Sequence, residues 1–410
     1  MITYELAIEK MLSQAVMLGD QTLPIAESLG FVAAQDVVCD CLISPFDNSA
    51  MDGFAVRYQD LQNGMVELMV VGSSFAGDEI SRGTEGAWEI MTGAGIPDGF
   101  DTVIKIEDVI IVNTDDNGRP ERIKLNQPDV PLGNNIRKAG QDFGLGDLVI
   151  AAGQKINAAH IAALATIGVA EILVHKKPAI AVISTGKEIV DDAGEPLQSG
   201  QIRNSNGPYL LATLQDMGFD VSYAGTIKDE IEDYEDCLNR LMGEYDIIIS
   251  TGAVSMGRHD FIPESLGKLG AEILFHKCKI RPGKPILFAK FKSQKAYYFG
   301  LPGNPISASV GLRFFVSNLI DALQGLPQEQ PIKAKLTKNN IKNHSFKMFN
   351  KAFATFENGT LNVDILQGQE SFKIKPLLTA NCWAVFEEDQ HKTQRNALVN
   401  IYPMSAQGKL

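Results

Sequence analysis

Three short apolar runs, each followed by a loop of small residues, constrain the fold of residues 177–325 most strongly. The runs cover 179–183, 246–249 and 297–299, and they lead into Ser-Thr-Gly (184–186), Ser-Thr-Gly (250–252) and Gly-Leu-Pro-Gly-Asn-Pro (300–305). Helical patterns are expected at 206–217, after a cap at Asp229, and at 306–324. Apolar strands that alternate with helices indicate a parallel α/β sheet.

The rest of the chain differs from this region and predicts an α/β multidomain protein. Amphipathic helices are expected at 4–18 and 158–167, and short β-like runs separated by turn residues fill 45–150 and 331–410. We therefore predict a helical linker domain (1–44 and 144–176), a β-rich lid (45–143), a central α/β domain (177–328) and a small C-terminal β-barrel (329–410).

Charge and cysteine content exclude several classes of protein. The net charge of −13 argues against non-specific binding to nucleic acid or to an anionic membrane surface. The sequence contains no run of 18 apolar residues, which a membrane-spanning helix would need, and the N-terminus lacks the features of a signal peptide. Five scattered cysteines form no disulfide framework and no CxxC zinc pair, so we expect a reducing cytoplasm.

The loops that follow the three strands form the first candidate site. Ligands of open parallel sheets bind beyond the carboxyl ends of the strands, where glycines allow close approach and free N–H groups hold phosphate. Each loop alone is explained by a tight turn, but three in one sheet favour a phosphate-bearing ligand. The candidate binding residues are Thr185, Gly186, Gly252, Ser255, Pro302, Asn304 and Pro305.

Basic residues cluster near these loops. If 273–281 forms a strand, its alternation places Lys277, Lys279 and Arg281 on one face, and Lys284 follows in the next turn. This arrangement suits a clamp for an anion. A charged edge strand that resists aggregation is the alternative.

Acidic loop residues form the third group. Glu188, Asp229 and Asp260 could hold Mg²⁺, with Zn²⁺ as the alternative, against phosphoryl oxygens. Helix capping by Asp229 and a solvated Glu188 are the structural explanations. The sequence has no HxxxH spacing and no Gly-x-Ser-x-Gly motif, which disfavours histidine-based zinc hydrolases and serine hydrolases.

The predicted lid contributes three polar motifs, Asp-Asn-Ser-Ala-Met-Asp-Gly (47–53), Met-Thr-Gly-Ala (91–94) and Asn-Ile-Arg-Lys-Ala-Gly-Gln-Asp (135–142). Turn chemistry alone explains each of them. Together they suit a lid that closes on a metal–phosphate ligand.

These motifs, in this order, resemble the molybdopterin molybdenumtransferase family, which includes the gephyrin E domain. The resemblance covers essentially the whole chain and is most specific at 46–57. Residues 91–94, 135–137, 140–142, 184–188, 282–285 and 301–305 support it. Departures from the family pattern are Gln141, Lys187, Ala253 and Arg281, whereas the carboxylates named above are retained.

The resemblance implies a function. A homodimer of four-domain subunits would convert adenylylated molybdopterin and molybdate, with a divalent cation, into molybdenum cofactor and AMP. It also implies transient contact with molybdopterin adenylyltransferase and with molybdoenzymes. The family's functional positions correspond to Asp52, Thr92, Asp142, Glu188, Asp229 and Asp260, and its basic positions to Arg137, Lys277, Arg281 and Lys284.

Three other functions remain open at this point. A molybdopterin adenylyltransferase resembles only 177–325. A non-enzymatic scaffold would act like gephyrin in receptor clustering, although the chain has no gephyrin-like N-terminal domain or linker. A sugar-phosphate enzyme would be expected if the motif match is misleading.

Overall fold

The computed structural model describes residues 1–127, 129–228, 230–252 and 261–404. They form two compact units. Unit 1 contains Met1–Gln21, Gly30–Val32 and Leu173–Leu410, and unit 2 contains Thr22–Leu29 and Ala33–Ile172. The N-terminal helix, which was expected in the linker domain, groups with unit 1, and the four-domain division stays a prediction.

The centre of unit 1 is a six-stranded sheet in the order β17-β14-β18-β22-β21-β19. The first four strands are parallel, and β21 and β19 are antiparallel additions at one edge. The prediction of a parallel α/β sheet is confirmed. The strands are β14 (Ile180–Thr185), β17 (Val221–Ile227), β18 (Ile247–Thr251), β19 (Ala271–His276), β21 (Leu287–Phe291) and β22 (Tyr297–Leu301).

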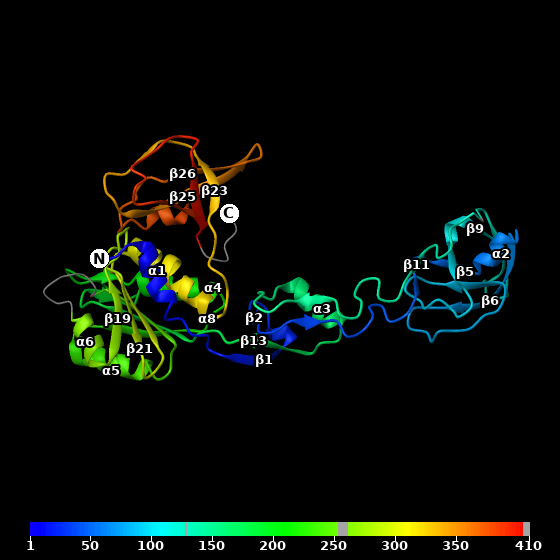
Figure 1. The fold of residues 1–410 in the computed structure, drawn as a ribbon, viewed down its shortest axis with the longest axis horizontal. Coiled ribbons are helices and arrows are strands. Elements are labelled where there is room, and N and C mark those ends of the chain that lie inside the picture. Colours follow the sequence, from blue (N-terminus) through cyan, green and yellow to red (C-terminus); the bar gives the residue numbers. More distant parts are fainter. Residues whose placement is uncertain (128, 229, 253–260, 405–410) are drawn as a thin grey trace. The chain divides into compact units, whose positions relative to one another are not determined.

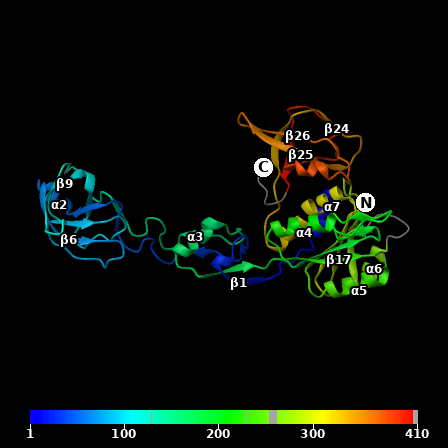
Figure 2. The same ribbon diagram turned by 180° about the vertical axis from the view of Figure 1, so that it is seen from behind.

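Helices cover both faces of this sheet (Figures 1 and 2). On one face lie α5 (Ile231–Leu241) and α6 (Ile262–Lys268), which pack through Tyr234, Leu238 and Leu266. The other face carries α1 (Tyr4–Leu12), α4 (Asn206–Asp216), α7 (Pro305–Gly311), a π-helical segment (Leu312–Val316) and α8 (Ser317–Leu323). The helix predicted over 306–324 is therefore interrupted by one π-helical turn.

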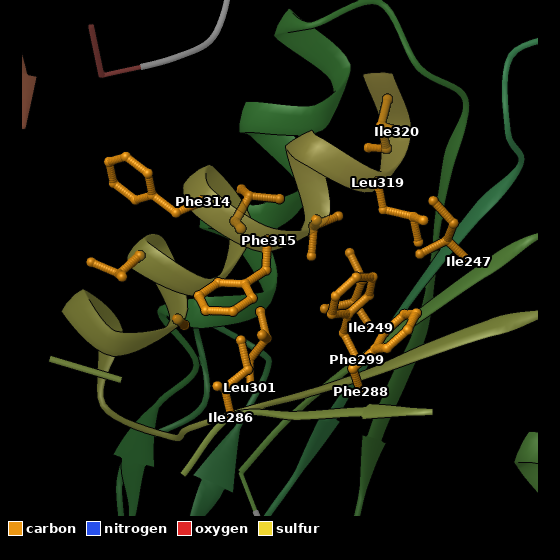
Figure 3. Packing of buried hydrophobic residues seen from close by; sticks show 14 of the residues in the cluster. Ile247, Ile249, Ile286, Phe288, Phe299, Leu301, Phe314, Phe315, Leu319 and Ile320 are labelled. Atoms are coloured by element: carbon orange, nitrogen blue, oxygen red, sulfur yellow. The ribbon is translucent and has the colours of Figure 1, made fainter. Parts of the chain in front are cut away.

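The larger core lies between the sheet and this second group of helices (Figure 3). Phe288 and Phe299 point up from the sheet, with ring centroids 5.0 Å apart, toward Phe315 and Leu319 of the helices. The segment Pro305–Leu323 is long and apolar enough to span a membrane, but its apolar 18-residue window is 83% buried inside the protein. In this structure it serves as a core helix.

The C-terminal part of unit 1 is a closed five-stranded barrel, as predicted. Its strands follow the order β25-β26-β23-β29-β27, and β27 pairs back onto β25. A short strand, β20 (Ile280–Arg281), joins the barrel at β25. The barrel strands are β23 (Ile332–Leu336), β25 (Lys347–Glu357), β26 (Thr360–Ile365), β27 (Cys382–Phe386) and β29 (Leu398–Pro403).

Unit 2 is rich in β-structure, as expected for 45–143. Its main sheet has the order β8-β5-β7-β6-β10-β9. The strands are β5 (Gly53–Val56), β6 (Glu67–Ser74), β7 (Ala87–Ile90), β8 (Thr102–Lys105), β9 (Val109–Thr114) and β10 (Pro120–Leu125), and the helices are α2 (Tyr58–Gln62) and α3 (Ala158–Thr166). Two shorter strands, β4 (Asn48–Ser49) and β11 (Ile136–Arg137), pair with each other.

Truncation of a core ring should test this account of the packing. Phe299 is fully buried in the larger core, so Phe299→Ala should lower the free energy of unfolding by about 3–5 kcal/mol. Phe356 is 73% exposed in the barrel, so Phe356→Ala should change it by less than about 0.5 kcal/mol. Urea unfolding followed by circular dichroism measures both variants, and equal losses would contradict the packing.

Candidate functional site

The carboxyl ends of β14, β18 and β22 open into a cavity of about 590 Å³. This volume is within the range of small-molecule and cofactor sites, about 300–1,000 Å³. All three predicted loops reach it. Of the residues predicted to bind ligand, Thr185, Glu188, Gly252, Pro302, Asn304 and Pro305 line the cavity.

Gly252 allows the loops after β14 and β18 to approach each other closely. It has a φ of +113°, and a Cβ there would lie 2.3 Å from the carbonyl oxygen of Thr185. Thr185 Oγ1 also donates to the carbonyl of Thr251 at 3.0 Å. A side chain at position 252 would force the two loops apart. Gly186, with a φ of +139°, acts within its own loop, where a Cβ would lie 2.8 Å from both carboxylate oxygens of Glu188.

Sequence reasoning missed a second set of cavity residues, 203–206, at the start of α4. Arg203 supplies a guanidinium group that is held by the carbonyls of Asp192 and Glu195. Asn206 is only 8% exposed, donates from Nδ2 to the carbonyl of Gly303 at 2.8 Å, and has an Oδ1 atom without a partner among the described residues. The sequence signal was Arg-Asn-Ser-Asn directly before a predicted helix.

Asn204 is held in the cavity wall by the carboxylate of Asp191, an exposed residue. Asp191 Oδ1 accepts from Asn204 Nδ2 (2.7 Å), from the Tyr223 hydroxyl (2.8 Å) and from Thr226 Oγ1 (2.9 Å). Burial alone would raise the pKa of Asp191, but these hydrogen bonds outweigh it and hold the pKa below its usual value. The ionised carboxylate therefore fixes the orientation of an amide that lines the site.

A second cavity of about 760 Å³ lies between the turn at 281–285 and the barrel segments 346–350 and 366–372. Arg281 and Lys284 line it, as does Ser307 of α7. It shares Pro285, Asn304 and Phe372 with the first cavity, so the two are adjacent. This places two of the predicted cations next to the loop site.

The other two predicted cations are placed differently. β19 ends at His276, and Lys277 has a φ of +75°, so no continuous strand carries the cations on one face. Lys279 Nζ lies 3.9 Å from Glu388 of the barrel. Among the residues that line these two cavities, Arg281 and Lys284 are present and Lys277 and Lys279 are not. The expectation of a single cationic face was wrong because the backbone turns after β19.

The predicted metal site is only partly visible. Glu188 lines the first cavity. Asp229, Asp260 and Ser255 lie outside the described residues. Within the part of the chain that the structure describes, no group of three His, Cys, Asp or Glu residues could hold a metal ion. Among the described residues, Glu188 is the one carboxylate of the first cavity and Glu370 that of the second, and they do not form a metal site by themselves.

Unit 2 brings together two of its predicted functional residues. Asp52 Oδ1 accepts from the backbone N–H of Thr92 at 2.7 Å and from Thr92 Oγ1 at 2.8 Å. The backbone hydrogen bond is the main reason that the pKa of Asp52 lies below its usual value, and the hydroxyl adds to it. Asp52 therefore offers an ionised carboxylate at the surface of this unit.

Asp47, which was not predicted as a site residue, ties the third lid motif to the first. It accepts from Lys138 Nζ at 2.7 Å and from the backbone N–H of Ala139 at 2.8 Å. Arg137 is paired with Asn48 across β11 and β4, and the backbone N–H of Asp142 donates to the carbonyl of Ile43 at 3.1 Å. The three motifs thus form one connected surface in unit 2.

The sequence matches two known families along most of its length. Residues 2–168 match the family described as the MoeA N-terminal region (domain I and II), and residues 181–322 match the probable molybdopterin binding domain. The molybdopterin molybdenumtransferase of Haemophilus influenzae is 34% identical over 413 residues, which cover 99% of each chain. That of Synechococcus elongatus is 34% identical over 95% of this chain and 96% of its own.

A solved structure shows the same architecture. The molybdopterin biosynthesis MoeA protein from Pyrococcus horikoshii superposes with a TM-score of 0.80 at 28% identity. The match covers 98% of this chain and 99% of that chain. The multidomain fold therefore extends over the full length of both proteins.

A methyl group at Gly252 should disturb the loop contact without changing any polar group. Gly252→Ala should lower the free energy of unfolding by about 1–3 kcal/mol, because of its positive φ and the close Thr185 carbonyl. Gly267 in α6 has open space around it, so Gly267→Ala should be neutral or stabilising by up to about 1 kcal/mol. Thermal unfolding measures both, and a Gly252→Ala variant as stable as Gly267→Ala would contradict this geometry.

The Asp52–Thr92 contact should be visible in a titration. Because the folded pKa of Asp52 is depressed, the contact stabilises unit 2 above about pH 4 and is lost as pH falls through the folded pKa. In Thr92→Val, which keeps the backbone donor but loses the hydroxyl, the Asp52 pKa measured by carboxyl NMR should rise. Asp115, whose depressed pKa depends chiefly on the Arg119 backbone, is the internal control. An unchanged Asp52 titration would contradict the assigned hydroxyl bond.

Proposed function

The chain belongs to the molybdopterin molybdenumtransferase family, and we propose that it inserts molybdate into adenylylated molybdopterin, releasing AMP and forming molybdenum cofactor. The best support for this reaction is that the first cavity, at the carboxyl ends of β14, β18 and β22, adjoins the second, between the turn at 281–285 and the barrel. One reactant would be a bulky phosphate ester and the other a small oxyanion. Two neighbouring cavities with a shared wall suit that combination.

The first cavity suits the phosphoanhydride substrate. Loops after three parallel strands place small residues and backbone groups where a phosphate would lie. Arg203 supplies a positive charge, and the amide of Asn206 has an unused oxygen that can accept a hydrogen bond from a ring or a sugar hydroxyl. In this proposal these groups bind and orient the substrate so that the anhydride is exposed to attack.

The second cavity suits molybdate. An oxyanion needs cations or hydrogen-bond donors, and Arg281, Lys284 and the Ser307 hydroxyl provide both. Lys284 Nζ lies 5.9 Å from the ring centroid of Phe346, in the same cavity wall. The shared wall of Pro285, Asn304 and Phe372 would bring the oxyanion next to the molybdopterin.

A divalent cation, Mg²⁺ or alternatively Zn²⁺, is part of the proposal. Glu188 at the first cavity would be one ligand, and Asp229 and Asp260 are the proposed others. When bound, the ion would neutralise negative charge on the phosphoanhydride. Without it, the chain's own role is binding: Arg203 and the loop N–H groups carry the phosphates, and Arg281 and Lys284 carry the oxyanion.

The remaining parts of the proposal rest on family resemblance. Asp52, Thr92, Arg137 and Asp142 of unit 2 are proposed to contribute to the reaction, within a homodimer and in the cytoplasm. Thr185, Gly186, Ser255, Lys277 and Lys279 remain proposed ligand-binding residues. An adenylyltransferase would consume ATP, whereas this reaction consumes molybdate, so a single assay distinguishes the two.

Removal of the carboxylates should test the site. Glu188→Gln and Asp260→Asn should each lower AMP release from adenylylated molybdopterin, in the presence of molybdate, by about 10- to 1,000-fold. Glu232→Gln, on the exposed surface of α5, is the matched control and should keep the wild-type rate. AMP is measured by chromatography, and wild-type rates in both site variants would refute this assignment.

A further inference from the structure

Phe372 is an exposed aromatic side chain at the two cavities. It lines both of them and is 63% exposed, whereas the rings of the cores are almost fully buried. Ile374, which lines the first cavity beside it, is 40% exposed. Large apolar side chains that converge on a concave surface are typical of a ligand-binding site.

The loop that carries Phe372 is held in place by a buried lysine. Lys351 of β25 is fully buried, and its Nζ donates to the carbonyls of Lys373 (3.1 Å) and Glu370 (3.4 Å). Gln369 closes the loop by bonding both the N–H (3.0 Å) and the carbonyl (2.8 Å) of Lys351.

The loop is also tied to the α/β domain. The backbone N–H of Ile306, in the first turn of α7, donates to the carbonyl of Ser371 at 3.0 Å. The backbone on both sides of Phe372 is thus held by hydrogen bonds, one set to Lys351 of the barrel and one to Ile306 of α7. The backbone that carries the ring is therefore positioned before any ligand binds, which lowers the entropic cost of binding.

A cation accompanies the ring. Lys373 Nζ lies 5.9 Å from the centroid of Phe372 and 2.8 Å from Glu370 Oε1. Glu370 neutralises this cation, and Lys373 lines neither cavity, so the face of the ring is the surface that a ligand would meet. Phe356, which is 73% exposed on the barrel, lines neither cavity and so serves as a comparison.

We propose that Phe372 is a specificity-determining residue that stacks on the flat heteroaromatic ring of the substrate. This inference rests on the proposed function and deepens it. Adenine and the pterin of molybdopterin are both flat heteroaromatic rings, so the shared chemistry is stacking. An aromatic face forms no directional hydrogen bonds to the edge of a stacked ring. Phe372 therefore selects for a flat ring, and the polar groups of the cavity determine the orientation of that ring.

Binding measurements on the full-length protein test the proposal. Isothermal titration of AMP, molybdopterin and ribose 5-phosphate would be compared for wild type, Phe372→Ala, Phe372→Tyr and Phe356→Ala. Phe372→Ala should weaken binding of AMP or of molybdopterin by about tenfold or more, and the ligand affected identifies the stacked ring. Phe372→Tyr and Phe356→Ala should bind as wild type, and ribose 5-phosphate, which has no ring, should be unaffected by any variant.

A spectroscopic readout separates stacking from a general loss of structure. In Phe372→Trp, the new indole should lose fluorescence when the same ring-bearing ligand is added, whereas Phe356→Trp should not respond. Unchanged affinity of Phe372→Ala for both ring-bearing ligands would overturn the proposal, as would an equal loss for ribose 5-phosphate. If wild type releases AMP normally while these tests fail, only the stacking role falls. If wild type neither binds these ligands nor releases AMP, the proposed function falls with it.

Discussion

Burial of the central sheet on both faces is the constraint on which the rest of unit 1 depends. Along β18, Ile247 and Ile249 face the larger core and Ile248 faces the smaller one, and all three are fully buried. Such a strand has no room for polar side chains except at its ends. The polar residues Ser250 and Thr251 come at its carboxyl end, next to Gly252. Polar groups that can bind a ligand therefore lie at the carboxyl edge of the sheet, because its buried interior excludes them.

The barrel belongs to the same packing system. Phe349, Trp383 and Val385 of the barrel are members of the larger core, and the rings of Phe314 and Phe349 lie 4.3 Å apart. Arg313, which is 6% exposed, adds a polar link, because it pairs with Glu329 at 2.7 Å and donates to the carbonyl of Pro403 at 3.0 Å. The barrel is therefore fixed against the α/β domain and can supply a wall of the second cavity.

Lys351 is a lysine buried in this packing. Burial lowers the pKa of its amine, because the charged form is poorly solvated inside the protein. The amine donates hydrogen bonds to two carbonyls of one loop, and the same loop carries Phe372 at the cavities. A buried lysine is costly unless its hydrogen bonds are made, so the loop conformation and the burial of Lys351 depend on each other. The backbone that carries an exposed ring is thus held by a residue in the barrel wall.

Sequence alone predicted three strands of the central sheet and the loops after them, because buried parallel strands and small-residue loops are local patterns; the phosphate-bearing ligand stays a prediction. The sequence predicted Thr185, Glu188, Gly252 and Asn304, which the tertiary structure brings to one cavity. Only the tertiary structure decided which cations face a cavity, since the positive φ of Lys277 ends the alternation that period-two reasoning assumed. It also decided that Arg203, Asn206 and Phe372 line a cavity. Asn206 bonds Gly303, 97 residues further along the chain, and Phe372 reaches the cavities from the barrel. Local periodicity does not encode contacts between segments so far apart in sequence.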